Sequence, residues 1–166
     1  MDNCLITGDV MDENLTIRKA EPEDCFTVGR MWKALMKEAG NYPVEIDKKV
    51  VQNFSIQLLT KILRDDGDVF IAEYDYRPVG FITVDLKVYN YCSLIYGYCE
   101  NVYVDPHYRT FLAGKKLIDT AFEWMKDRGA KIASFDTIYS EKLIKRWNVM
   151  GYEAKIIGFA KEIKYG

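Results

Sequence analysis

The sequence predicts a mixed α/β domain, and three observations lead to that fold class. The chain has 166 residues, a length typical of one domain. Hydrophobic residues make up 49% of it and charged residues 29%, which is an ordinary globular composition. Short runs of strand-forming residues alternate with segments whose apolar residues repeat at helical spacing. Their order is β-α-α-β-β-β-α-β-α-β, so strands joined by short turns come first and crossover helices follow.

The first elements are a strand and a helix. Residues 1–14 are polar and without pattern, and we expect them to form an N-terminal arm before a single domain at 15–166. Leu15–Arg18 alternates between apolar and polar residues and predicts a strand. Glu21–Asp24 predicts a helix start, because proline and acidic residues both favour the first helical turn. The apolar residues of 25–39 keep to one face of that helix.

A second helix and a hairpin follow. Apolar residues spaced by four predict a helix over about 45–63. Residues 65–68 form a turn rich in aspartate, and the apolar run after it predicts a strand at 69–73. Tyr76–Pro78 is predicted to connect it, as a hairpin, to another strand at 79–86.

The second half of the chain predicts crossover connections. A strand at 98–104 is followed by the clearest helix, at 114–128, and then by a strand at 131–135. Because a helix joins these two strands, we expect them to run parallel. A last helix at 141–150 precedes a final strand or strand pair at 152–163.

Composition and charge exclude several classes of protein. The net charge of −2 argues against general nucleic-acid binding. The single histidine and the scattered cysteines argue against a metal site. No secretory leader and no membrane-spanning run are visible, so we expect a cytoplasmic protein with reduced thiols and no membrane association. The four cysteines are Cys4, Cys25, Cys92 and Cys99.

The segment between the strand at 98–104 and the next helix carries the strongest chemical signal. Residues 106–118 contain Arg109, Lys115 and Lys116 and no acidic residue. The first backbone N–H groups of a helix have no acceptor within it, and the helix dipole places positive charge there. Small residues at Ala113 and Gly114 would let a phosphate approach the backbone. The alternative is that these bases only solvate a surface turn. The segment is neither a P-loop nor a G-x-G-x-x-G fingerprint.

The run Glu100-Asn101-Val102-Tyr103-Val104-Asp105-Pro106-x-Tyr108-Arg109-x4-Gly114, followed by a helix, resembles the acetyl-coenzyme A motif of the GNAT superfamily of N-acetyltransferases. Arg146-Trp147-x3-Gly151-Tyr152 resembles the last helix of that family. The resemblance covers about residues 15–163. It implies a GNAT-like α/β (α+β) fold, with a mixed, mostly antiparallel sheet of six to seven strands and about four helices. The R-x4-G form is also similar to acetyltransferase-like proteins of tailed phages.

Three residues depart from the family pattern. Leu112 stands where the family has its first glycine, although a leucine still offers its backbone N–H. Trp147 replaces a tyrosine often proposed to protonate the leaving thiolate, and an indole does not titrate in the useful range. Ser140 stands where many members have asparagine. These departures keep an alternative open, in which the chain is a non-catalytic GNAT-fold protein that binds coenzyme A or a protein partner.

The resemblance implies a cosubstrate site for acetyl-coenzyme A without a metal. The pyrophosphate is expected on backbone N–H groups of residues 109–115, and the pantetheine along the strand before them as a strand-like partner. The residues expected to bind it are Val102, Val104, Arg109, Thr110, Leu112, Ala113, Gly114 and Lys115.

The implied reaction is transfer of the acetyl group to a primary amine, by direct attack in a ternary complex. An alkyl ammonium has a pKa of about 10.4 and must lose a proton first. The resemblance places Glu100 as the proton acceptor, partly shielded from water. The alternative is a solvated or ion-paired strand residue. Tyr139 and Tyr152 are candidates for the missing acid, and a thiolate can also leave unassisted, since thiol pKa values lie near about 8.5.

The acceptor and the oligomeric state stay open. The amine belongs to a small molecule, such as an aminoglycoside or polyamine, or to a protein lysine or N-terminus. Loops around 38–46 and 86–99 are expected to contact it, and a homodimer is not excluded. His107 is expected to be an exposed loop residue. Trp32 and Trp124 are expected to pack in the core.

Overall fold

The computed structural model describes residues 14–40, 45–109, 111–136 and 141–154. The chain divides into two units, residues 1–136 and residues 137–166. The first unit holds one β-sheet and three α-helices, and the described part of the second holds a single helix. With four helices in the described residues, the predicted helix number is confirmed.

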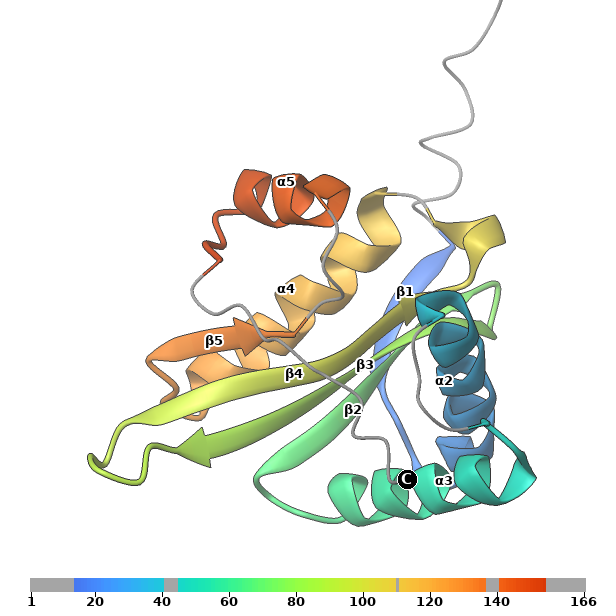
Figure 1. Ribbon diagram of the computed structural model, residues 1–166, viewed down its shortest axis with the longest axis horizontal. Coiled ribbons are helices and arrows are strands. Elements are labelled where there is room, and N and C mark those ends of the chain that lie inside the picture. The colour runs from blue at the N-terminus through green and yellow to red at the C-terminus, as the bar shows by residue number, and fades with distance from the viewer. Residues whose placement is uncertain (1–13, 41–44, 110, 137–140, 155–166) are drawn as a thin grey trace, which may run out of the picture. The chain divides into compact units, whose positions relative to one another are not determined.

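The sheet has the strand order β1-β2-β3-β4-β5 (Figure 1). Strands β1 to β4 pair antiparallel, and β5 pairs parallel to β4, as predicted. The prediction of six to seven strands is wrong for the described residues, which form five. Tyr152–Ala154 form no strand, and the rest of the last predicted strand lies outside the described residues. The strands are β1 (Leu15–Lys19), β2 (Gly67–Tyr74), β3 (Arg77–Val88), β4 (Ile95–Val104) and β5 (Ile132–Phe135).

The turn between β2 and β3 lies earlier than predicted. Its two central residues are Asp75 and Tyr76, with φ of 48° and 62°. A two-residue hairpin with positive φ at both positions matches the right-handed twist of the strands it joins. Arg77 and Pro78, which were expected to belong to the turn, are therefore the first residues of β3.

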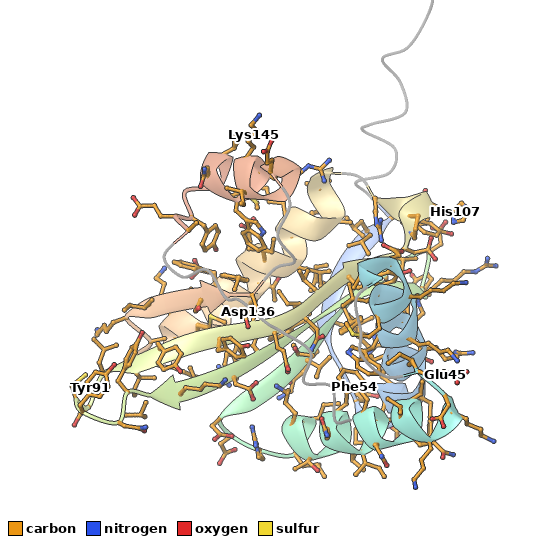
Figure 2. All side chains as sticks on the ribbon, in the orientation of Figure 1. Glu45, Phe54, Tyr91, His107, Asp136 and Lys145 are labelled. Carbon is orange, nitrogen blue, oxygen red and sulfur yellow. The ribbon has the colours of Figure 1, made fainter. Side chains whose placement is uncertain are left out.

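Helices α2 (Cys25–Ala39) and α3 (Lys48–Ile62) pack closely against each other. A Cβ at Gly29 would lie 2.4 Å from Ser55 Oγ, so the close approach requires glycine there. The rings of Trp32 and Phe54 stack with centroids 4.1 Å apart, which confirms Trp32 as a core residue (Figure 2). Helix α3 begins at Lys48 rather than about residue 45, because the Asp47 side chain accepts a hydrogen bond from the Val50 N–H.

Helices α2 and α3 cover one face of the sheet, and α4 (Phe111–Asp127) covers the other (Figure 1). Val69, Ile71 and Phe81 join residues of α2 and α3 in one buried cluster. On the other face, a Cβ at Gly97 would lie 2.2 Å from the sulfur of Met125 in α4. Because side chains alternate along a strand, this pattern assigns each sheet residue to one of the two layers.

A β-bulge interrupts the pairing of β3 with β4. Ile82 pairs with Val102 and Val84 with Cys99, so Glu100 and Asn101 together stand opposite the single residue Thr83. The Thr83 hydroxyl accepts hydrogen bonds from the backbone N–H and the side-chain amide of Asn101, at 3.3 and 3.4 Å. Both residues are buried. A bulge bends its strand and redirects a side chain.

The bulge also lies where β5 leaves β4. The parallel pairing ends at Cys99 and Phe135, and the Asp136 N–H then donates to the Cys99 carbonyl at 3.1 Å. Beyond Cys99, β5 provides no further pairing for β4. The described pairing of these two strands therefore ends just before Glu100.

Replacing Thr83 with valine should destabilise the protein. Valine has the same shape but leaves two buried donors of Asn101 without an acceptor, at a cost of about 1–3 kcal/mol. Urea unfolding measures the loss, and Thr83→Ser, which keeps the hydroxyl, should lose less. A Thr83→Val protein as stable as the parent would show that the hydroxyl does not hold the bulge.

Candidate functional site

In β4 beyond the bulge, the backbone N–H and carbonyl groups of every second residue point away from β3. The Asp105 N–H donates to the Val79 carbonyl on β3 at 2.7 Å. Backbone groups alternate sides along a strand, so those of Val102 and Val104 point toward the side that β5 has left. The Val104 carbonyl accepts a hydrogen bond from Arg109 Nε at 2.7 Å. Val102 thus offers its backbone N–H and carbonyl to an extended ligand.

The N-terminus of α4 provides the second part of the site. The helix begins at Phe111, three residues before the predicted start, and its first turn contains no acidic residue. A Cβ at Gly114 would meet nothing within 4 Å, so protein packing does not require glycine there. That open space fits a phosphate close to the backbone. Ala113 is buried and Leu112 half-buried, whereas Thr110 lies outside the described residues.

Arg109 and Lys115, which were predicted to attract an anion, both have carboxylate partners. Arg109 Nη2 lies 2.5 Å from Glu38 Oε2 at the end of α2. The Lys115 ammonium pairs with Asp119, one helical turn further on. The Arg109 guanidinium therefore ties α2 to the end of β4. This contact joins residues 71 positions apart, and nothing in the local sequence pattern indicates it.

The turn between β4 and α4 is ordered by Asp105. Its carboxylate accepts hydrogen bonds from the His107 backbone N–H and from His107 Nδ1, at 2.9 and 3.0 Å. The backbone hydrogen bond is the main reason that the pKa of Asp105 lies below its usual value. The His107 side chain is 89% exposed, as predicted (Figure 2).

Glu100 lies in the bulge and is exposed, rather than partly shielded from water as expected. Because Glu100 and Asn101 both stand opposite Thr83, the extra residue turns the carboxylate outward. Among the described residues, no ion pair or hydrogen bond engages the Glu100 side chain. It is therefore accessible to an incoming acceptor.

Tyr98 lies two residues before Glu100 on β4. Its hydroxyl donates to Asp136 Oδ2 at 2.5 Å. Burial raises the pKa of Tyr98 most, and the hydrogen bond to Asp136 and the charges of Asp136, Glu100 and Asp85 raise it further. Tyr98 is thus a neutral phenol at physiological pH.

The buried cysteines of the described residues are not nucleophiles. Burial raises the pKa of the Cys99 thiol, which lies directly beside Glu100. The pKa of Cys25 is also raised, mainly by burial. Both are therefore protonated at neutral pH, and a thiol attacks carbonyl groups far more slowly than a thiolate.

The second unit carries α5 (Glu141–Val149). The Trp147 ring meets the Tyr152 ring edge-on, with centroids 5.3 Å apart. Gly151, with φ of 86°, follows the helix. Tyr139 and Ser140 lie outside the described residues.

Neither a metal-binding group of side chains nor a membrane-spanning helix occurs in the described residues. No group of three or more histidine, cysteine, aspartate or glutamate side chains within residues 14–40, 45–109, 111–136 and 141–154 is arranged to hold a metal ion. In the same residues, no helix is long and apolar enough to cross a membrane.

Trp124 is buried, as predicted, and Arg128 lies over its ring at 4.2 Å.

Residues 29–152 match the model of the Acetyltransferase (GNAT) family. An uncharacterized N-acetyltransferase of Methanocaldococcus jannaschii is 28% identical over 105 residues, which cover 61% of this chain and 46% of that protein. The chain thus spans about half the length of this relative. An uncharacterized N-acetyltransferase of Archaeoglobus fulgidus is 28% identical over 123 residues, 72% of this chain and 79% of that protein. These relatives are archaeal, and the resemblance to phage proteins finds no support in them.

Solved structures share the fold. A GCN5-related N-acetyltransferase from Ralstonia eutropha superposes with a TM-score of 0.72 at 22% identity, covering 90% of this chain and 98% of that one. An aminoglycoside acetyltransferase from an uncultured soil sample, in complex with sisomicin, gives a TM-score of 0.67 at 17% identity and covers 93% and 99%. The match over residues 29–152 identifies the family, and the described strands and helices agree with its fold. The chain therefore belongs to the GNAT acetyltransferase family.

Proposed function

We propose that this protein transfers the acetyl group of acetyl-coenzyme A to a primary amine, by direct attack in a ternary complex. Family membership supports an acetyltransferase. The observation that carries the proposal is the bulge at Glu100 and Asn101, because it places an exposed carboxylate beside a strand edge that no other described strand pairs with. The protonated state of Cys99 supports direct attack over an acyl-cysteine intermediate.

The cosubstrate would bind along β4 and onto α4. The backbone groups of Val102 and Val104 on the open edge would take the pantetheine. The first turn of α4 would take the pyrophosphate, with Gly114 leaving room for it. Leu112 takes part through its backbone N–H. Arg109, Thr110, Ala113 and Lys115 complete the proposed set.

Glu100 would supply the base. Its exposed carboxylate takes a proton from the acceptor ammonium, directly or through one water. The freed nitrogen lone pair attacks the thioester carbonyl, and the backbone of β4 would polarise that carbonyl as an oxyanion-type donor. The carbon–sulfur bond then breaks, the thiolate leaves with its electron pair, and the nitrogen loses its second proton to that thiolate or to water, which gives the neutral amide. A thiol pKa near about 8.5 makes a protein acid unnecessary, which is consistent with Trp147 in place of tyrosine.

Gly114→Glu should abolish binding of coenzyme A, because it puts bulk and negative charge where the phosphate would lie. Isothermal titration calorimetry measures this. Gly114→Ala is the matched variant. Because alanine stabilises a helix by about 1 kcal/mol relative to glycine, this variant should have a larger free energy of unfolding than the parent. It should nevertheless bind coenzyme A more weakly. Unchanged coenzyme A affinity in Gly114→Glu would refute the placement.

Glu100→Gln should lower turnover about 10²-fold, the low end for loss of a general base, and leave the affinity for acetyl-coenzyme A nearly unchanged. Release of coenzyme A thiol measures turnover. The deficit should shrink as the pH rises toward about 10.4, because more of the amine is then already neutral. Parental turnover at pH 7 on a good amine acceptor would show that another group takes the proton.

A non-catalytic protein with the same fold is the second candidate. The observation that favours it is Trp147, whose indole contacts Tyr152 and cannot act as a titrating acid. Such a protein would bind acetyl-coenzyme A and release no thiol with any amine. A cytoplasmic location, the absence of general nucleic-acid binding and a homodimer stay predictions from the sequence.

A further inference from the structure

A lysine ammonium already lies on an aromatic ring beside the proposed base. Lys87 Nζ lies 3.5 Å from the centroid of the Tyr98 ring. Asp85 pairs with Tyr98 and Lys87 pairs with Tyr96, so these side chains share one face of the sheet. Lys87 is exposed, so its ammonium can leave the ring and be hydrated instead. An alkyl ammonium is attracted to the face of a tyrosine ring by the ring quadrupole.

The Tyr98 ring is held in place independently of Lys87. The hydrogen bond from its hydroxyl to Asp136 links β4 to the residue that follows β5 (Figure 2). The Asp136 N–H also donates to the Cys99 carbonyl at 3.1 Å. Both bonds cross the point where the two strands diverge. The ring is therefore a preorganised surface at the entrance to the proposed site.

The charges around the ring favour a cation. Asp85 is neutralised by Lys61 and by Arg64, whose Nη2 lies 3.0 Å from it. Asp136 and Glu100 have no cationic partner among the described residues. Their negative charges both act on Tyr98, as its raised pKa indicates. An ammonium on this ring is thus exposed to the negative charge of two carboxylates that have no described cationic partner.

The spacing along β4 sets the length of a matching ligand. Tyr98 and Glu100 are two residues apart on one strand, so their Cα atoms lie at most about 7 Å apart. An alkyl chain of about four or five methylene groups separates two nitrogens by a similar length. A diamine of that length would place one ammonium on the ring while its other nitrogen reaches the Glu100 carboxylate.

We propose that the Tyr98 ring binds a second positive charge of the acceptor, so that the preferred acceptors are primary diamines with nitrogens about 7 Å apart. The Lys87 ammonium occupies this position until the acceptor displaces it. The inference rests on the proposed function and assigns Tyr98 the role of selecting the acceptor.

The test compares 1,5-diaminopentane with n-pentylamine, which has the same carbon chain and one nitrogen. At saturating acetyl-coenzyme A, kcat/KM from thiol release should be about 10-fold higher for the diamine, more than the twofold due to its two equivalent amines. In Tyr98→Leu the ratio of kcat/KM for the diamine to kcat/KM for n-pentylamine should fall to about two. Tyr98→Phe keeps the ring and should retain most of the preference.

Lys87→Met should lower the KM for 1,5-diaminopentane, because it removes the competing ammonium and keeps the length of the side chain. Lys33→Met is the matched control, since it makes the same change in net charge at an exposed position on α2. It should leave KM unchanged. An equal decrease in both variants would indicate a general charge effect and would overturn the role of Lys87.

Calorimetry separates failure of this inference from failure of the proposed function. Titrating 1,5-diaminopentane into the complex with coenzyme A measures docking without turnover, and Tyr98→Leu should weaken it about 10-fold. Absence of thiol release alongside this weakening would refute the proposed function alone. The inference is overturned if the parent and Tyr98→Leu bind the diamine with equal affinity. It is also overturned if kcat/KM of the parent is only about twofold higher for the diamine than for n-pentylamine.

Discussion

The mismatch of two residues of β4 against one residue of β3 is the constraint on which the site depends. Glu100 and Asn101 stand opposite Thr83, whose buried hydroxyl accepts both hydrogen bonds that Asn101 directs at it. The extra residue lies where the pairing with β5 ends, its carboxylate is exposed, and the backbone of Val102 beyond it has no strand partner on that side among the described residues. One hydrogen-bonded irregularity thus underlies both the proposed binding edge and the exposed carboxylate proposed as the base.

The surroundings of the bulge hold that arrangement rigid. Asp105 extends the pairing of β4 with β3 through Val79 and orders the turn that follows. Arg109 binds the Val104 carbonyl and Glu38, and so fixes the start of α4 relative to the strand end and to α2. The arginine that the sequence singles out as an anion ligand therefore has a positioning role within the protein. The proposed anion site therefore depends on the helix backbone and on Gly114.

Local signals in the sequence predict most of the elements and their faces. The described strands lie within about three residues of their predicted bounds, and the parallel pairing of β4 with β5 follows from the connecting helix. The burial of Trp32 is predicted by the helical periodicity of residues 25–39, because burial on one face imposes a repeat. The family motif likewise identifies the strand end and helix start around Gly114.

The features that define the chemistry arise from contacts between residues distant in the chain. The bulge depends on which residue of β4 meets Thr83, 18 positions earlier, and a pattern of apolar residues does not encode that register. The Tyr98–Asp136 bond spans 38 positions and the Arg109–Glu38 pair 71. The exposure of Glu100 follows from the bulge, so a regular strand predicts the wrong environment for it.

Amide hydrogen exchange at Val102 tests the central claim most directly. If the bulge frees this edge for the cosubstrate, binding of coenzyme A should pair the Val102 N–H and slow its exchange, measured by NMR. The Asp105 N–H, which already donates to Val79, should be unaffected and serves as the internal reference. Saturating coenzyme A with no change at Val102 would show that the cosubstrate binds elsewhere and would contradict the account.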